Sequence, residues 1–348
     1  VTLRSGEEME IRVVEPPMGD YADQVGCWRD VREDLLGGVF KPWLFTPYFI
    51  GEIDGSVAGS MSYYVSRECR NIGVVEFVHT DEAHRQKGIG SHLMSALIEQ
   101  FHEDGGKALY LCTSNSVAGH LYERHGFRYH VGDGMRYLSP GEDDFDAVQW
   151  AHYGQASVRD AHWGDLADLS ALYNHPEPRW QLKDYLTQTF ADTRYESHFI
   201  RLMRRIEDGR GSYVVLETPS RKLVGAAAFE RLDTFYEQHV ATMGFRVTPA
   251  YVDQVGELFD AACERAAALS VRTLQVPVSA SDEDEAELLQ SAGFCEEGRL
   301  PNRLRTDCGW SDLLIYGKTL TASSDPVRPS ESYYGLRKRW QEEKVGSE

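Results

Sequence analysis

The sequence predicts an α/β protein that contains two successive domains. A chain of 348 residues is longer than a typical single domain and can bury two separate cores. Residues 72–79 are dense in Val, Ile and Phe, which predicts a strand, and residues 88–101 repeat apolar side chains at three- and four-residue spacing, which predicts a helix. A second strand-then-helix opening at residues 156–159 echoes residues 11–14, and this echo indicates an internal repeat of about one domain length.

The segment that joins this strand to this helix, Arg85 to Gly90, reads Arg-Gln-Lys-Gly-Ile-Gly. The first turn of a helix has unpaired backbone N–H groups and a partial positive charge, so a phosphate can bind there without side chains. A Cβ at Gly88 or Gly90 would hold the phosphate away from those amides, and Arg85 and Lys87 add positive charge. The segment therefore predicts a phosphate site. The alternative interpretation is an ordinary start of a helix with two glycines in the turn, which would have the same sequence pattern.

The spacing of this turn excludes the two common nucleotide-binding turns. It does not follow Gly-x-Gly-x-x-Gly, and no Gly-Lys-Ser or Gly-Lys-Thr comes after it. Its strand also lies in the middle of the domain, whereas a dinucleotide-binding strand opens a βαβ unit. Dinucleotides and nucleoside triphosphates are therefore not the expected ligands.

A second motif follows a short apolar strand at residues 108–112 and reads Asn115-x-x-Ala118-x-x-Leu121-Tyr122-x-x-x-Gly126-Phe127. Together the two motifs resemble the GNAT superfamily of acyl-CoA-dependent N-acyltransferases, whose signature is Arg-x-x-Gly-x-Gly followed by Asn-x-x-Ala-x-x-Leu-Tyr-x-x-x-Gly-Phe. The resemblance covers residues 10–138, from a strand over residues 10–14 to a closing strand pair after Phe127. It implies a central mixed, mostly antiparallel β-sheet flanked by helices, and an acyl-CoA such as acetyl-CoA as the co-substrate.

The internal repeat extends this resemblance to two tandem GNAT-type folds. Turn-forming and charged residues at 139–144 mark a boundary, and residues 293–299 and 312–318 resemble the closing strands of a second GNAT fold. We expect a catalytic domain over residues 1–140, a linker over 141–154, a degenerate GNAT-like domain over 155–320, and a tail over 321–348 that starts polar and Pro-rich and ends in a short helix carrying Trp340.

The second copy is expected to have lost the chemistry of the first. Counted from Val247, residues 252–257 stand in place of Arg85 to Gly90, so that Val255, or Gly256 after a shift of one residue, lies opposite Gly88. The same counting places Met243 opposite Glu76, Asp282 opposite Asn115 and Leu289 opposite Tyr122. We therefore expect a single working site, in the first domain.

The resemblance implies that Glu76 is the general base and that Tyr122 is the general acid that protonates the departing CoA thiolate. Alternation along the strand is expected to put Glu76 on the same face as Val78 and Thr80, and partial burial should raise the pKa of its carboxyl. The strand is expected to splay from its neighbour and to offer the N–H of Val78 to the thioester carbonyl. A surface ion pair for Glu76 and core packing for Tyr122 are the alternative interpretations.

The remaining site residues are also implied by the resemblance. The expected acyl-CoA contacts are Val78, His79, Thr80, Arg85, Gln86, Lys87, Gly88, Ile89, Gly90, Ser91 and Asn115, the last of which would hold the co-substrate or an ordered water. The acceptor amine is expected near Trp28, Arg29, Trp43, Phe45 and Tyr63, with Tyr64 as a further candidate. Core packing explains each of these acceptor-side residues equally well.

Composition excludes several other classes of protein. A formal charge of −19 argues against nucleic acid and anionic membranes as partners and is compatible with a cationic amine substrate, although it also fits a merely well-solvated enzyme. The six cysteines include no Cys-x-x-Cys pair and the twelve histidines no His-Glu-x-x-His, so we expect reduced thiols and no metal, with His125 at a helix C-terminus. Without a signal-peptide core or a long apolar run, we expect a cytoplasmic protein, either a monomer or a homodimer.

The leading hypothesis is an N-acyltransferase, most simply an acetyltransferase, that acts on the amine of a small molecule or peptide. Two alternatives stay open. One is a non-catalytic acyl-CoA-binding or sensing protein whose second domain reads out occupancy, and the other is an acyltransferase with a larger donor such as succinyl- or malonyl-CoA. The presence of both Glu76 and Tyr122 favours an enzyme, because a protein that only binds acyl-CoA needs neither.

Overall fold

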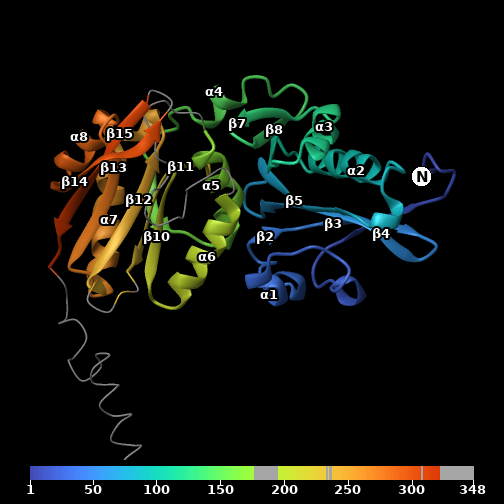
Figure 1. Ribbon diagram of the computed structural model, residues 1–348, viewed down its shortest axis with the longest axis horizontal. Coiled ribbons are helices and arrows are strands. Elements are labelled where there is room, and N and C mark those ends of the chain that lie inside the picture. The colour runs from blue at the N-terminus through green and yellow to red at the C-terminus, as the bar shows by residue number, and fades with distance from the viewer. Residues whose placement is uncertain (176–194, 233, 235–236, 307–308, 322–348) are drawn as a thin grey trace, which may run out of the picture.

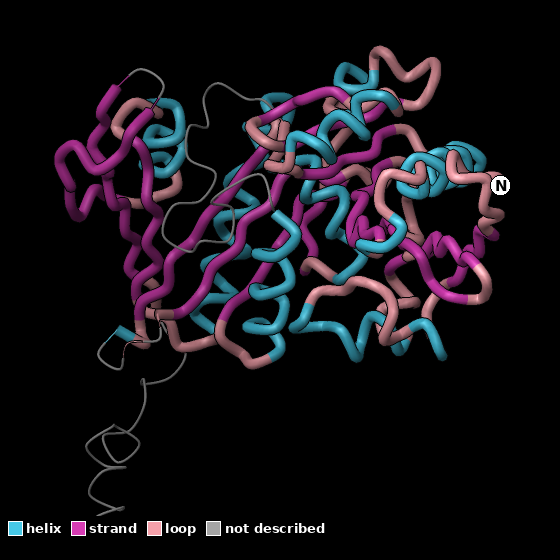
Figure 2. Tube along the Cα trace, turned by 45° about the vertical axis from the view of Figure 1, so that its right-hand side comes forward, coloured by secondary structure: helices cyan, strands magenta, loops and turns pink. Residues whose placement is uncertain are grey.

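The computed structural model describes residues 1–175, 195–232, 234, 237–306 and 309–321. The predicted α/β class is confirmed, because these residues form two mixed β-sheets with helices packed on them (Figures 1 and 2). The expected tail helix around Trp340 lies outside the described residues. No helix in the described part of the chain is long and apolar enough to cross a membrane.

The first sheet has the strand order β1-β3-β4-β5-β6-β8-β7, and β2 pairs with β4 at one side of this path. Helices α2 and α3 lie on one face of the sheet and α1 lies on the other (Figure 1). This first unit consists of β1 (Glu10–Val14), η1 (Gly19–Tyr21), η2 (Arg29–Val31), α1 (Arg32–Gly37), β2 (Leu44–Phe45), β3 (Tyr48–Ile53), β4 (Ser56–Ser66), β5 (Ile72–Thr80), η3 (Glu82–His84), α2 (Ile89–Glu103), β6 (Ala108–Cys112), α3 (Ser116–Arg124), β7 (Arg128–Val131) and β8 (Gly134–Leu138).

The second sheet has the strand order β14-β15-β13-β12-β11-β10-β9. It is joined to the first by α4 (Phe145–Gln149), which lies within the segment predicted as a linker. This second unit consists of β9 (Ser157–Asp160), η4 (Trp163–Asp165), α5 (Leu166–Tyr173), α6 (Tyr195–Glu207), β10 (Gly211–Glu217), β11 (Leu223–Arg231), β12 (Val240–Val247), η6 (Pro249–Gln254), α7 (Val255–Ala268), β13 (Thr273–Ser279), α8 (Glu283–Ser291), β14 (Cys295–Thr306) and β15 (Gly309–Thr319).

The two sheets repeat the same topology. Read from β1 and from β9, the strand orders correspond position by position, and β5–β6 and β12–β13 are the parallel pairs among the described strands. The strand registers of the two sheets correspond as well. When the parallel pairs are matched, the pair Tyr48–Ser62 of the first sheet takes the place of the pair Tyr213–Ala228 of the second. This correspondence is what the tandem arrangement predicted.

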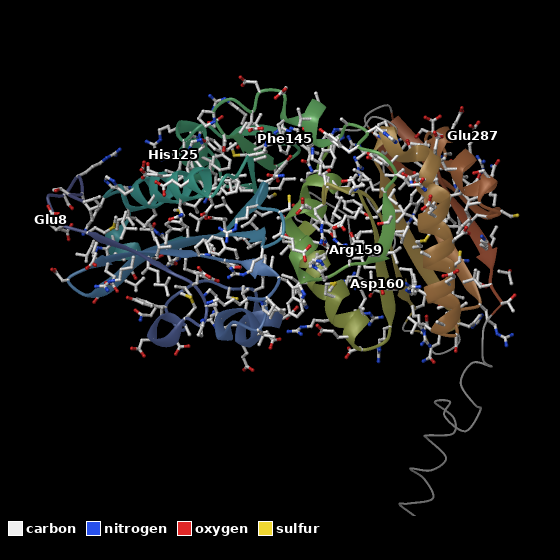
Figure 3. The ribbon with its side chains drawn as sticks, turned by 180° about the vertical axis from the view of Figure 1, so that it is seen from behind. Glu8, His125, Phe145, Arg159, Asp160 and Glu287 are labelled. Atoms are coloured by element: carbon white, nitrogen blue, oxygen red, sulfur yellow. The ribbon has the colours of Figure 1, made fainter. Side chains whose placement is uncertain are left out.

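The two units share an apolar cluster at their interface, and each also has a core of its own. Helices α5 and α6 lie between the sheets (Figure 1), and α5 packs against β4, β5 and β11. The shared cluster joins Tyr64 and Val74 of the first sheet to Leu169 and Phe199 of these helices. Phe145 belongs to the same cluster and lies between the units in Figure 3. The chain therefore buries the two separate cores that its length predicts and a third cluster where the units meet.

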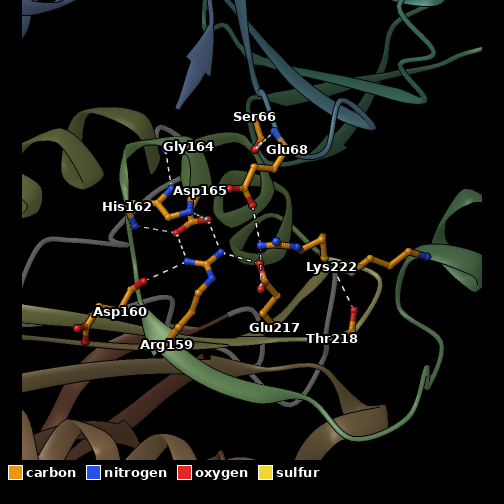
Figure 4. A network of polar contacts seen from close by, with 11 residues as sticks. Ser66, Glu68, Arg159, Asp160, His162, Gly164, Asp165, Glu217, Thr218 and Lys222 are labelled. Atoms are coloured by element: carbon orange, nitrogen blue, oxygen red, sulfur yellow. Dashed lines mark hydrogen bonds and ion pairs between the residues drawn. The ribbon is translucent and has the colours of Figure 1, made fainter. Parts of the chain in front are cut away.

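A network of ion pairs within the second unit reaches the same interface (Figure 4). The guanidinium of Arg159 donates to Asp165 at 2.7 Å and to Glu217 at 2.8 Å, and all three residues belong to the second unit. Arg221 pairs with Glu68 of the first unit at 2.7 Å. The Arg221–Glu68 pair therefore adds a directional contact between the units to the apolar interface.

Candidate active site

The strands β5 and β6 separate after three residue pairs. Ile72–Val74 pairs with Ala108–Tyr110, and beyond this point β5 stays paired with β4 up to Thr80 while β6 stays paired with β8 up to Cys112. The sheet is therefore split along the second half of β5, as expected. Glu76 lies on β5 at the start of the split.

A β-bulge at Phe77 interrupts β5 at this point. Phe77 has a φ of +57°, which is unusual for a residue with a side chain. The register changes from Glu76 opposite Ser62 to His79 opposite Ser60, so Phe77 and Val78 together face one residue of β4. Backbone strain of this kind is concentrated at functional sites in many proteins.

The bulge overturns the expectation that Glu76 shares a face with Val78 and Thr80. Glu76 is paired with Ser62 and so lies on the face of the sheet that carries Tyr64, next to the second unit. Val78 packs into the core under α2, and Thr80 Oγ1 lies 3.9 Å from a Cβ built at Gly90 of α2. The inserted residue reverses the alternation, and therefore the carboxylate and the end of the strand point to opposite faces.

Tyr122 lies on the other face of the sheet from Glu76, and the charge of Glu76 acts on its phenol. Tyr122 lies on α3 and is 6% exposed. Burial and the negative charge of Glu76 raise the pKa of Tyr122 to about 12, so the phenol is protonated at neutral pH. Burial and the same charge also raise the pKa values of Tyr48 and Tyr64. The charge of Glu76 therefore acts on phenols of α3, β3 and β4.

Trp28 packs against the cluster of Tyr64, on the face of the sheet that carries Glu76. Its ring centroid is 4.9 Å from that of Tyr64 and 4.9 Å from that of Phe77. Arg29, its neighbour, is exposed on η2. An acceptor role for Trp28 and Arg29 stays a prediction.

The other three predicted acceptor-side residues lie elsewhere. Phe45 and Tyr63 belong to the core under α2, on the opposite face from Glu76, and the guanidinium of Arg70 lies 4.4 Å from the Phe45 ring. Trp43 is 38% exposed at the junction of the units, where its carbonyl oxygen is 3.0 Å from a Cβ built at Gly164. We assign Phe45 and Tyr63 to core packing, which was the alternative interpretation.

The turn before α2 has the conformation that its glycines predicted. Gly88 is the N-cap of α2 with a φ of +95°, and a Cβ built there would meet only side-chain atoms of Arg4, at 3.7 Å or more. Gln86 also has a positive φ, of 65°. We predicted that a side chain at Gly90 would obstruct a phosphate, but the structure gives a different reason for the glycine: an added Cβ would lie 3.3 Å from the Leu121 side chain of α3. The turn therefore leaves space for an anion at Gly88, and Gly90 lets α2 pack on α3.

Arg4 also lies at this turn, which the sequence did not predict. Its backbone N–H donates to the carbonyl oxygen of Lys87 at 3.3 Å, and its guanidinium lies against Gly88. The cations that were predicted are near carboxylates, with Lys87 2.9 Å from Glu7 and Arg85 3.1 Å from Glu82. The N-terminal segment therefore brings a further positive charge to the turn. Arg4 is more than 80 residues from Gly88 in the sequence and belongs to no motif, so the sequence does not indicate this contact.

Three further predicted residues fix α2 and α3. Ser91 Oγ lies 2.8 Å from His125 Nε2, which links the two helices. His125 is the C-cap residue of α3, as expected, and burial and the charge of Arg124 lower its pKa. The Asn115 side chain accepts hydrogen bonds from two amides in the first turn of α3 and so caps that helix. Contact of Ser91 and Asn115 with acyl-CoA stays a prediction.

Comparison with known proteins adds to this geometry. The family model of the acetyltransferase (GNAT) family matches residues 21–127, which contain both motifs, the bulge and the split strands. The first unit carries a GNAT domain. No curated protein matches the chain.

Several solved acetyltransferases resemble the chain in structure. They include an N-acetyltransferase from Staphylococcus aureus Mu50 (20% identity over 48% of this chain and 99% of that one, TM-score 0.40). A putative acetyltransferase from Salmonella typhimurium, solved with its cofactor acetyl-CoA, is 16% identical over 50% of this chain and 99% of that one, with a TM-score of 0.43. A GNAT superfamily phosphinothricin acetyltransferase from Sinorhizobium meliloti, in complex with acetyl-CoA, is 18% identical over 52% and 99%, with a TM-score of 0.43.

The second unit repeats the strand order of the GNAT domain without its bulge. Strand β12 pairs with β11 in one unbroken register, from Gly225–Val247 to Arg231–Ala241. Because β5 has one residue more than β12, the equivalent of Glu76 is Gly244 and not the expected Met243. The position still carries no carboxylate, so the conclusion about the base is unchanged.

The turn before α7 differs from the GNAT turn in length and contents. The connection from β12 to α7, Thr248–Gln254, is one residue shorter than the connection from β5 to α2, Asp81–Gly88. When the two helix starts are matched, Gln254 corresponds to Gly88, whereas the two expected registers put Val255 or Gly256 there. The expected equivalences on the later helix hold, because Asp282 and Asn115 are both N-cap residues. By the same count Leu289, which is fully buried, corresponds to Tyr122.

The segment that joins the units lies against this second turn. The backbone N–H of Tyr153 donates to Tyr251 Oη at 2.7 Å. The N–H of Ala156 donates to Gln254 Oε1 at 3.0 Å, and Gln254 Nε2 donates to the Ala156 carbonyl at 3.1 Å. Side chains of the second turn, Tyr251 and Gln254, are therefore engaged by the segment that joins the units. In the described residues no group of three or more His, Cys, Asp and Glu side chains could hold a metal ion.

Proposed function

We propose that this protein is an acyl-CoA-dependent N-acyltransferase, most simply an N-acetyltransferase, with one site in its GNAT domain. The observation that carries the proposal is the split between β5 and β6: Glu76 lies at its start, and the charge of this carboxylate acts on the buried, protonated phenol of Tyr122. A base and an acid on the two sides of a split sheet are what transfer from a thioester to an amine requires. The acceptor is the amine of a small molecule or peptide.

In this reaction Glu76 takes a proton from the acceptor ammonium, directly or through a water, and the free amine attacks the thioester carbonyl. The carbonyl oxygen gains negative charge, which the N–H of Val78 at the bulge would stabilise. When the carbon–sulfur bond breaks, Tyr122 gives its proton to the CoA sulfur, and the nitrogen of the new amide gives its extra proton to the Tyr122 phenolate, which restores the phenol. Glu76 releases the proton that it took from the ammonium to solvent, so the products are the amide, CoA and one proton.

The turn at Gly88 fits the pyrophosphate of acyl-CoA. It combines the exposed start of a 15-residue helix with a left-handed glycine whose missing Cβ leaves room for the phosphate. Arg4, Arg85 and Lys87 lie around the same turn and counter the negative field of the chain. These residues would bind the co-substrate and orient its acyl end toward Glu76.

Acetyl-CoA is expected to bind with a stoichiometry of one per chain. Gly88→Glu should abolish binding in a calorimetric titration, because a side chain strained at a φ of +95° would place a carboxylate where the pyrophosphate binds. The matched control is Gly256→Glu, since Gly256 is exposed at the start of α7 and a Cβ there meets no atom within 4 Å. Two bound equivalents, or loss of binding in Gly256→Glu, would contradict a single site.

Glu76→Gln is expected to lower the turnover number by about 10²- to 10⁴-fold at neutral pH, because the amide cannot accept the ammonium proton. The variant should also lose the acidic limb of the pH–rate profile, since that limb reports protonation of the base. Steady-state rates from pH 5 to 9 test this, with exposed Glu99 of α2 changed to Gln as the control. An unchanged acidic limb in Glu76→Gln would assign the base to another group. Repeating the assay with succinyl- and malonyl-CoA compares the donors.

A further inference from the structure

Residues 1–9 form a small hairpin, called the N-terminal hairpin below, that lies next to the start of α2 (Figure 1). Thr2 and Glu8 form an antiparallel bridge, and the N–H of Leu3 donates to the Glu7 carbonyl at 2.9 Å. Leu3 is 4% exposed and belongs to the core under α2. The hairpin is therefore held by its own backbone bonds and by an apolar anchor.

Two contacts join the N-terminal hairpin to the turn before α2. The N–H of Arg4 donates to the carbonyl oxygen of Lys87 at 3.3 Å, and Lys87 Nζ lies 2.9 Å from a carboxylate oxygen of Glu7. The first contact ties the two backbones together, and the second is an ion pair between a side chain of the turn and a side chain of the hairpin. Together they hold the backbone of Arg4 next to the turn.

The side chain of Arg4 lies over the glycine that caps α2. The three atoms nearest to a Cβ built at Gly88 all belong to Arg4, with Nε at 3.7 Å, Cγ at 3.8 Å and Cδ at 3.9 Å. A phosphate in the space that the missing Cβ leaves would therefore contact the guanidinium. This group presents a planar fork of N–H donors, which matches the oxygens of a phosphate.

The three cations at this turn differ in what they already bind. Lys87 is paired with Glu7 at 2.9 Å, and Arg85 is paired with Glu82 at 3.1 Å. The Arg4 side chain is exposed and has no hydrogen bond or ion pair with any described residue. A paired cation must leave its carboxylate before it can bind a phosphate, whereas an unpaired one gives up only water. Arg4 is therefore the cation that is ready to bind an anion at Gly88.

In the second unit too, the segment before the first strand lies on the turn before the helix. Besides the bonds of Ala156 with Gln254, Gln155 Nε2 donates to Glu257 Oε1 at 3.3 Å. Residues 150–156 contain no Arg or Lys. Contact between this segment and this turn is thus common to both units, whereas the guanidinium at the turn belongs to the first.

We propose that Arg4 is the cation that binds the pyrophosphate of the CoA donor, and that Lys87 is a positioning residue that holds the N-terminal hairpin through Glu7. Arg85, although it belongs to the motif, then has a minor part in donor binding. This inference rests on the proposed function, because it requires the pyrophosphate to lie at Gly88. It assigns separate roles to the three cations that surround the turn.

The test measures the affinities of CoA and dephospho-CoA, which share the pyrophosphate and differ in the 3′-phosphate, by calorimetric titration. For Arg4→Gln we expect both Kd values to rise by the same factor, about 10- to 100-fold, because a charge-assisted contact with a group common to both ligands is lost. Arg85→Gln should change either Kd by about threefold at most. The matched control is Arg303→Gln, which removes an exposed arginine from β14 of the second unit.

The positioning role of Lys87 has a separate readout. Changing Lys87 to Met together with Glu7 to Gln removes the ion pair without changing the net charge, and we expect the Kd of CoA to rise about three- to tenfold. In a chain that already carries Arg4→Gln, the same pair of changes should have little further effect, because the ion pair acts through Arg4. An undiminished loss in that background would give Lys87 a phosphate contact of its own and overturn its positioning role.

The outcomes separate this inference from the proposed function. Unchanged affinities in Arg4→Gln, or a loss confined to CoA, would overturn the inference and leave the proposed function standing. A larger loss in Arg85→Gln than in Arg4→Gln would overturn it as well. Binding of CoA that depends on Arg4, without acetyl transfer to a panel of amines, would support the inference and refute the proposed function. A wild-type chain that binds neither ligand would refute both.

Discussion

Tyr122→Phe is expected to lower the turnover number by about 10²- to 10⁴-fold while the affinity for acetyl-CoA stays nearly constant. The hydroxyl is used only when the CoA thiolate departs, whereas the ring, which is 6% exposed and packs near Phe127, holds its place in either variant. Single-turnover rates and calorimetric affinities, measured on the same preparation, separate the two effects.

The pH profile of the wild-type enzyme provides a second check. With the pKa of Tyr122 raised to about 12 by burial and by Glu76, the phenol keeps its proton throughout the usual assay range, so it should cause no fall in rate up to about pH 10. The control is Tyr137→Phe, because Tyr137 packs on the same Phe127 ring and burial is the cause of its raised pKa. A rate for Tyr122→Phe equal to that of Tyr137→Phe would remove Tyr122 from the mechanism.

Deleting residues 155–348 is expected to yield insoluble or weakly active protein. The cut removes α5 and α6 from a cluster that also contains Tyr64, Ile72 and Tyr110 of the first sheet, and it separates the stacked rings of Phe40 and Trp163, whose centroids are 4.1 Å apart. A large apolar patch on one face of a small domain promotes association. Solubility, size-exclusion behaviour and acetyl transfer are the measurements.

The control for this truncation is deletion of residues 322–348, which leaves every described helix and strand in place. We expect that shorter deletion to be soluble. If the form lacking residues 155–348 were soluble and transferred acetyl groups at the full rate, the second unit would be dispensable for both the stability and the activity of the first.

Local elements of this protein could be predicted from sequence because their signals are local. The strand before the turn, α2 and the short strand β6 lie where apolar spacing and glycines placed them, within one or two residues. The internal repeat was predicted from the similarity of residues 156–159 to residues 11–14 and from two closing strands. In the structure the repeat includes the order of the strands and the pairing of Tyr48 and Tyr213.

Other features of the site depend on contacts between distant parts of the chain. The bulge at Phe77 adds one residue to a strand that reads as regular alternation, so the face of Glu76 and its counterpart in the second sheet were both misjudged. Arg4 reaches Gly88 through a segment with no motif of its own. Phe199 of α6 joins the buried cluster of Tyr64 only because α6 packs between the sheets. Pairing and packing decide these positions, and a single sequence does not reveal them.

The contacts of the joining segment with Tyr251 and Gln254 tie the connection between the units to the turn before α7. Gln254 stands at the place of Gly88 and anchors Ala156 through two hydrogen bonds. Gln254→Gly would remove both bonds and release Ala156 from the turn. A glycine at this position would therefore loosen the connection between the units, so space for a phosphate and order of the joining segment compete for the same residue.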